Sequence, residues 1–277
     1  MLISLKEILA IAEEKQFAVP AFNVYNMETV MGVIAAAEEL NAPIIIQCYS
    51  RLFTNGEGYY LAPVIIAAAK KAKVPVAFHL DHGASESEVM KAVRYGATGV
   101  MIDKSLLSLE ENIKGTKNVV DLCRDIDVSV EGEIGHIGVA AQGDENTIAY
   151  TEVSDAKRFV EETGVSALAI MVGTAHGRYK QAPKLAIDRI KEIHEAVDAS
   201  LVLHGGSGVP DEEIKAAIAA GIRKINFGTD LCYSFLDKVF ETSRDKVAID
   251  LFMKDAISNV SEFAKGKIKL LGAENKA

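Results

Sequence analysis

Eight short apolar segments alternate with amphipathic helical segments, and this alternation constrains the fold more than any other feature of the sequence. Several of the helical segments open with Ser, Asp or Pro and close with Gly. Near-continuous apolar strands separated by helices are typical of a parallel sheet with both faces buried. The predicted strands cover residues 17–23, 42–48, 74–81, 98–103, 127–133, 167–173, 200–206 and 223–228.

Eight repeats of strand and helix predict an α/β protein with the (β/α)8 TIM barrel fold rather than an open doubly wound sheet. The chain has 277 residues, a length at which such barrels commonly form one domain. No Pro- or Ser-rich linker and no change of composition divides it. We therefore expect a single domain over residues 1–277 with a helical tail from about residue 250.

Charge and composition exclude several classes of partner. The formal net charge is −9, and no basic cluster with interleaved aromatic residues is present, so nucleic acid is not an expected partner. Three cysteines without CxxC spacing argue against a disulfide framework or a thiolate zinc site. The amphipathic, acid-containing start of the chain differs from a signal peptide, and no segment reaches the ~20 apolar residues of a membrane span. We expect a cytoplasmic protein with no membrane partner.

Polar residues follow nearly every predicted strand, at the barrel end where active sites of this fold lie. A single histidine after a strand is usually a hydrogen-bonded structural residue. Three histidines after strands three, six and seven instead match the three protein ligands of a catalytic zinc site. Asp81, beside one of these histidines, would be placed for proton transfer. The polar positions are Asn23, Gln47 to Ser50, Asp81, His82, Asp103, Glu133, His176, His204 and Asn226.

Glycine-rich turns predict a phosphate site next to this metal. Residues 173–177 and 204–208 follow strands six and seven, and their backbone N–H groups can face an anion. Residues 226–230 follow strand eight and lead into a helix, which places amides and Thr229 at a helix N-terminus. Phosphate sites of barrels commonly form from the loops after strands seven and eight.

Six motifs in this order resemble the class II, metal-dependent ketose-bisphosphate aldolases, which include the fructose 1,6-bisphosphate and tagatose 1,6-bisphosphate aldolases. They are HLDHG, MID, VEGEIG, GTAHGRYK, LVLHGGSG and KINFGTD, and the similarity covers roughly residues 1–240. The resemblance implies a lyase of carbohydrate metabolism, such as glycolysis, that cleaves a phosphorylated sugar reversibly to dihydroxyacetone phosphate and an aldehyde. Fructose 1,6-bisphosphate is the first expectation. Tagatose 1,6-bisphosphate or a ketose phosphate without the distal phosphate stays open.

The resemblance also implies roles for individual residues. Zinc would be bound by His82, His176 and His204, with Na⁺ or K⁺ nearby. Asp103 and Glu133 would lie close to the metal, as alternative ligands or as carboxylates that orient the histidines. Asp81 would be the acid/base at the C4 hydroxyl of the substrate. Implied substrate contacts are Asn23, Ser50, Gly177, Lys180, Gly205, Gly206, Ser207, Asn226, Gly228 and Thr229.

Residues 135–152 form a long connection that is similar to the mobile loop of the family, which carries a second acid. Asp144 or Glu145 could be that group, and Glu145 is the predicted second catalytic residue. Family members also tend to be homodimers or homotetramers. They usually carry an Asp-Pro-Arg near the C-terminus, whose arginine binds the distal phosphate, but here Val247 stands in that region. Arg51, Arg244 or Lys246 could take its place.

Three rival interpretations remain. Lys104 after strand four, or Lys224 within strand eight, could serve a Schiff-base aldolase, although such an enzyme has no use for three converging histidines. A zinc hydrolase on the same barrel would use the metal to generate hydroxide, but such barrels commonly open with an HxH pair that strand one lacks. A non-catalytic scaffold protein would have no reason to keep the ligand set.

Overall fold

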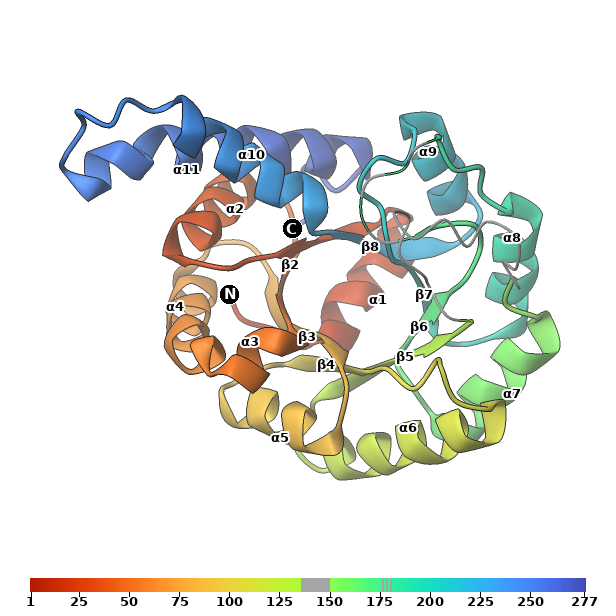
Figure 1. The fold of residues 1–277 in the computed structure, drawn as a ribbon. Helices are drawn as coiled ribbons and strands as arrows, with labels where there is room; N and C mark the ends of the chain where they lie inside the picture. The colour runs from red at the N-terminus through yellow and green to blue at the C-terminus, as the bar shows by residue number, and fades with distance from the viewer. Residues whose placement is uncertain (136–149, 176, 178, 180) are drawn as a thin grey trace.

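The protein is a closed barrel of eight parallel strands with helices outside it (Figure 1). The structure, a computed structural model, describes residues 1–135, 150–175, 177, 179 and 181–277. Each strand pairs with the next along the chain, and the last pairs with the first. This arrangement confirms the predicted TIM barrel. The strands are β1 Val19–Asn23, β2 Ile44–Tyr49, β3 Val76–Gly83, β4 Gly99–Ile102, β5 Ser129–Ile134, β6 Ala167–Ile170, β7 Ser200–Leu203 and β8 Ile222–Phe227.

The helices cover the outside of the barrel, and their starts follow the capping signals in the sequence. Ser4, Asn26 and Ser108 each accept a hydrogen bond from the backbone N–H three residues later and form a capping box. The helices are α1 Leu5–Lys15, α2 Met27–Glu39, α3 Ser50–Asn55, α4 Glu57–Lys71, α5 Glu86–Arg94, α6 Leu109–Arg124, α7 Val153–Thr163, α8 Ile187–Ala196, α9 Asp211–Ala219, α10 Thr229–Glu241 and α11 Ile249–Leu270.

The first helix closes the amino-terminal end of the barrel. Leu5 N donates to Thr98 O, Lys6 N donates to the Ser129 hydroxyl, and Ile3 N donates to Val76 O, so the start of the chain touches the starts of β3, β4 and β5. The buried face of α1 includes Leu5, Ile8 and Leu9. This end is therefore filled by packing, and the carboxyl ends of the strands are left for a functional site.

The last two helices form an extension beside the barrel. Part of α11 packs on α2, where a methyl group at Gly32 would lie 2.6 Å from Val260 Cγ1. The loop between α10 and α11 lies at the outer edge of the molecule (Figure 1), and we call residues 236–255 the arm. Among the described residues, no helix combines the length and the apolar character needed to cross a membrane.

Candidate active site

The carboxyl ends of β3, β5 and β7 bring Asp81, His82, Glu133 and His204 together. One ligand atom each from Asp81, His82 and His204 lies within 4.8 Å of the others, and the same holds for His82, Asp103 and Glu133. Nitrogen and carboxylate oxygen donors at such spacing are the ligands that zinc prefers. His176, the third predicted ligand, lies outside the described residues.

A local break in β3 puts two neighbouring side chains on the same side. In a regular strand, successive side chains point to opposite faces, so Asp81 and His82 could not both face one site. His82 has φ +52°, a conformation that costs a non-glycine residue energy. The register with β4 shifts between Leu80 and Gly83 at this point. Glycine is required at position 83, because a Cβ there would lie 2.5 Å from Met101 O.

His82 and His204, the two described histidines among the predicted zinc ligands, each have one ring nitrogen engaged by a carboxylate. Asp103 Oδ2 lies 2.9 Å from His82 Nδ1, and Glu131 Oε1 lies 2.8 Å from His204 Nε2. Because an ionised carboxylate only accepts, both nitrogens carry hydrogen. The remaining nitrogens, Nε2 of His82 and Nδ1 of His204, face each other at 3.1 Å. The carboxylates thus fix which nitrogen of each ring points into the site.

The acidic surroundings of His82 favour its charged form. Burial by itself lowers the pKa of His82, but the charge of Asp81, the hydrogen bond to Asp103 and the charge of Glu133 outweigh it and raise the pKa to about 9. The proton on His82 Nε2 can then be donated to His204 Nδ1, which matches the 3.1 Å distance. Glu133 Oε2 lies 3.4 Å from the same His204 nitrogen. Glu133 and the two inward-facing ring nitrogens therefore lie together at this position.

Asp81 lies in a cradle of side-chain amides. Asn23 Nδ2 donates to Asp81 Oδ2 at 2.7 Å, and Asn226 Nδ2 lies 3.2 Å from Oδ1. Burial alone would raise the pKa of Asp81, but the nearby His82, His204 and Lys224 charges and the Asn23 hydrogen bond hold it below its usual value. Asp81 is therefore ionised at neutral pH and oriented by β1 and β8.

A layer of buried charges lies beneath the histidines, and our sequence reasoning missed it. Lys224 Nζ donates to Glu131 Oε2 at 2.8 Å, and neither side chain is exposed. His79 Nε2 lies 3.3 Å from the same oxygen without forming a hydrogen bond. Burial tends to raise the pKa of Glu131, yet Lys224, His204 and His79 lower it well below its usual value. Glu131 is therefore a buried carboxylate that orients His204.

A signal for this layer was present in the sequence. Side chains two residues apart in a strand share a face, so Glu131 shares the interior with Glu133, and His79 shares it with Asp81. The same spacing relates Lys224 to Asn226. The two lysines considered for a Schiff base are both engaged. Lys224 is paired with Glu131, and Lys104 donates to Ala84 O at the solvent-exposed rim.

The loops after β6, β7 and β8 contact each other at the carboxyl end of the barrel. Gly205 has φ +67°, and a Cβ there would lie 2.3 Å from Ala175 O, so the backbones of the β6 and β7 loops approach closely. The Ser207 hydroxyl accepts from Asp230 N, and the Asp230 carboxylate accepts from Gly208 N. These contacts fix the β7 loop against the first turn of α10.

The other predicted substrate contacts have varied positions. Gly206 is buried within the β7 loop, and Gly177 lies in the β6 loop with φ +98°. Gly228 and Thr229 begin α10, and Ser50 begins α3 just past the end of β2. Lys180 and the predicted loop acids Asp144 and Glu145 lie outside the described residues.

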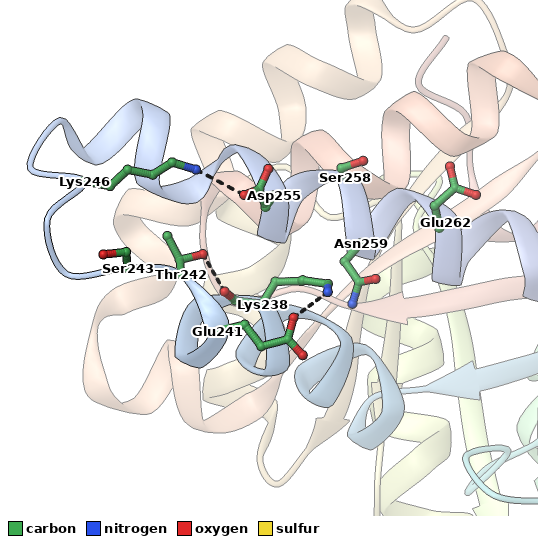
Figure 2. A pocket seen from close by; sticks show the side chains of 9 residues that line it. All are labelled: Lys238, Glu241, Thr242, Ser243, Lys246, Asp255, Ser258, Asn259 and Glu262. Atoms are coloured by element: carbon green, nitrogen blue, oxygen red, sulfur yellow. Dashed lines mark hydrogen bonds and ion pairs between the residues drawn. The ribbon is translucent and has the colours of Figure 1, made fainter.

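A separate cleft lies between α10 and α11 (Figure 2), and no described histidine lines it. Both lysines that line it are paired with acids of the same cleft. Lys246 pairs with Asp255 at 3.2 Å, and Lys238 pairs with Glu241. The Thr242 hydroxyl is also engaged, since it donates to Lys238 O. This cleft holds no group comparable to the histidine cluster, so the carboxyl end of the barrel remains the candidate active site.

Comparison with known proteins identifies the family of this chain. Residues 3–276 match the family model described as "Fructose-bisphosphate aldolase class-II". The chain belongs to the class II aldolase family. It is 38% identical to a sulfofructosephosphate aldolase of Alkalicoccus urumqiensis, over 99% of this chain and 98% of that protein. It is 39% identical to the protein YdjI of Escherichia coli K12, described as uncharacterized, over 96% of each.

Solved structures of aldolases share the whole fold. The crystal structure of the YdjI aldolase from E. coli K12 aligns with a TM-score of 0.91 and 36% identity over 100% of both chains. A putative fructose-1,6-bisphosphate aldolase from Coccidioides immitis aligns with a TM-score of 0.90 and 25% identity, over 98% of this chain and 97% of that one. This class II aldolase is therefore a lyase, and members of its family act on phosphorylated sugars.

Proposed function

We propose that this enzyme is a zinc-dependent aldolase that cleaves a ketose 1-phosphate reversibly to dihydroxyacetone phosphate and an aldehyde. The observation that carries the proposal is the arrangement of His82 and His204. One nitrogen of each ring is engaged by a carboxylate, so the other nitrogen points into the site, and these two nitrogens face each other beside Asp81. Carboxylates that orient metal-binding histidines in this way are typical of metal sites.

The donor set fits zinc, with His176 as the proposed third ligand and Glu133 and Asp103 beside it. When bound there, zinc supplies the Lewis acid that stabilises the negative charge developing next to the substrate carbonyl when the C3–C4 bond breaks. Glu131 fixes His204 in the tautomer that such binding requires, and Asp103 does the same for His82.

Asp81 is the proposed acid/base at the C4 hydroxyl. Cleavage needs a base that removes the hydroxyl proton as the aldehyde forms. Asp81 is ionised at neutral pH, and Asn23 and Asn226 fix its orientation. The buried Asn226 Oδ1 and Gln47 Oε1 have no hydrogen-bond partner among the described residues. They are available to accept from substrate hydroxyls. Glu145 stays the proposed second acid.

The proposed site for the C1 phosphate is the junction of the β6, β7 and β8 loops, with Gly177, Lys180, Gly205, Gly206 and Ser207 as contacts. The N-terminal amides of α10, at Gly228 and Thr229, add positive potential there. Asn23 on β1 lies beside Gly228, since a Cβ at Gly228 would be 3.2 Å from Asn23 Oδ1, and Ser50 lies at the start of α3 after β2. We also propose that Na⁺ or K⁺ binds near the phosphate, and that the enzyme acts in the cytoplasm.

Fructose 1,6-bisphosphate is the first substrate to test, and a ketose 1-phosphate with a different charged tail is the second. The family name supports the former, and the sulfofructosephosphate aldolase relative supports the latter. The two share the dihydroxyacetone phosphate half, so the residues proposed above serve either substrate.

Metal removal tests the reaction class. Dialysis against a strong chelator should abolish cleavage of the substrate that the enzyme uses, and added zinc should restore it. Borohydride with substrate should trap no adduct on Lys104 or Lys224, which mass spectrometry of the intact protein would detect. Cleavage that survives complete metal removal, checked by elemental analysis, would refute the proposal.

A further inference from the structure

We propose that Arg51 is a specificity-determining residue that recognises an anionic group, a phosphate or a sulfonate, at the aldehyde end of the substrate. This inference rests on the proposed aldolase function and adds to it the class of tail that the enzyme selects. It also assigns a position to the distal contact that the family's Asp-Pro-Arg motif would otherwise supply. Val247 stands in that region of this chain.

Arg51 lies at the mouth of the barrel, on two tyrosine rings. Its Cζ is 5.4 Å from the centre of the Tyr25 ring and 5.2 Å from the centre of the Tyr49 ring. Tyr25 follows β1 and Tyr49 ends β2, so the two rings come from adjacent strands. The Tyr49 ring in turn lies 5.7 Å from the His82 ring. Arg51 is thus separated from the metal site by a single aromatic side chain.

Cation–π contact leaves the hydrogen-bonding edge of the guanidinium open. A guanidinium on an aromatic face keeps its N–H groups in the ring plane, where they can bind two oxygens of an anion. Four other arginines, Arg124, Arg158, Arg189 and Arg223, pair with carboxylates. Within the part of the chain that the structure describes, no carboxylate pairs with Arg51. Arg51 is exposed, and the two rings position its guanidinium while its N–H edge stays open to solvent or to a ligand.

The order of groups around the barrel places the tail of the substrate near Arg51. The proposed C1 phosphate site lies at the β7 and β8 loops, and Asp81 on β3 would meet the C4 hydroxyl. Tyr49 is the register partner of Asp81 on the neighbouring strand β2. Carbons beyond C4 that extend past Asp81 toward β2 therefore reach Tyr49 and then Arg51. A charged group at C6 would be placed beside the guanidinium.

The other two cations considered from the sequence are placed less well. Lys246 already pairs with Asp255 in the arm. Arg244 belongs to the loop between α10 and α11, which lies at the outer edge of the molecule (Figure 1). Neither lies at the mouth of its own barrel. Arg51 alone of the three combines a position beside the site with a free hydrogen-bonding edge.

Aldol condensation with a matched set of aldehydes tests the role of Arg51. Dihydroxyacetone phosphate is combined with glyceraldehyde 3-phosphate, with the analogue that carries a sulfonate at C3, or with uncharged glyceraldehyde. Wild type should prefer one of the charged aldehydes, and the two charged arms identify whether phosphate or sulfonate is bound better. Arg51→Met should lower kcat/KM for that aldehyde about 10- to 150-fold, mainly through KM. The change for glyceraldehyde should stay below about threefold.

Control variants separate recognition from folding. Arg94→Met removes an exposed arginine on α5 and should change none of the three activities. Arg51→Lys keeps the charge but loses the planar guanidinium group. Its kcat/KM for the charged aldehyde should therefore lie between those of wild type and Arg51→Met. Circular dichroism and zinc content of Arg51→Met should match wild type. If Arg51→Met is unstable, Arg51→Gln replaces it in the same comparison.

Several outcomes would overturn the inference. One is that Arg51→Met lowers kcat/KM for glyceraldehyde as much as for the charged aldehydes, or lowers it for none of them. Another is that wild type prefers glyceraldehyde. A third is that Arg244→Met, and not Arg51→Met, selectively loses activity with the charged aldehyde. Failure of the underlying proposal gives a different result. If wild type with zinc condenses none of the aldehydes, the aldolase function itself is wrong, whereas an active wild type with unaffected Arg51→Met removes only the role of Arg51.

Discussion

Breaking the buried pair of Glu131 and Lys224 should destabilise the protein and also weaken metal binding. Neither side chain is exposed to solvent, and Nζ lies 2.8 Å from Oε2. Lys224→Met leaves the carboxylate buried without its counter-charge, and removal of one partner of such a pair costs about 3–5 kcal/mol. Glu131→Gln should cost a similar amount, because Lys224 then loses its partner.

The double variant Glu131→Gln/Lys224→Met should recover most of this stability. With both charges gone, the interior carries no unpaired ion, and neutral replacement of a buried pair is often tolerated. The coupling energy from the double-mutant cycle should therefore exceed about 2 kcal/mol. Urea unfolding of the zinc-free proteins, followed by circular dichroism, measures it.

The double variant should regain stability but not metal affinity. Glu131 also accepts from His204 Nε2, and loss of such a carboxylate behind a metal-binding histidine lowers metal affinity about 10- to 100-fold. Competition with a chromophoric zinc chelator should show this loss in Glu131→Gln and in the double variant alike. Additive destabilisation by the two single changes, or wild-type zinc affinity in the double variant, would refute the reasoning.

Three further predictions follow from the site and the arm. Asp81→Asn should keep its zinc and lose about 10²- to 10⁴-fold in turnover; loss of the metal in elemental analysis would instead make Asp81 a structural support. Zinc binding must displace the proton of His82, whose pKa is raised to about 9. Zinc affinity should therefore rise with pH up to about 9. Calorimetry in buffers of different ionisation enthalpy should detect the proton release. A pH-independent affinity would contradict this. The exposed apolar side chains of the arm are Leu236, Phe240, Val247, Ile249 and Leu251. We propose that the arm contacts a second copy in a homodimer or homotetramer. Phe240→Asp should then lower the mass measured by sedimentation, and an unchanged mass would mean that the interface lies elsewhere.

The sequence was sufficient to predict the barrel because its signals are local. A fully buried parallel strand must be apolar along its whole length, and a helix on its outside must repeat its apolar positions with the helical period. These patterns recur eight times without a break. The start of α11 at Ile249 also agrees with the expected helical tail.

The positions of the polar residues at strand ends were predictable for the same reason. The fold fixes where the carboxyl ends of the strands meet, so Asp81, His82 and His204 could be expected at one end of the barrel before any contact was known. Their roles as catalytic or metal-binding groups stay predictions, and they depend on the experiments above.

The tertiary structure alone decided how the histidines are held. No local pattern indicates that Glu131 reaches His204 across the barrel, or that Lys224 on β8 neutralises it from 93 residues away. The same applies to the left-handed backbone at His82, which turns two adjacent side chains to one site. A sequence states which side chains share a strand face, but pairs between distant strands depend on the closure and register of the barrel, and these exist only in the folded chain.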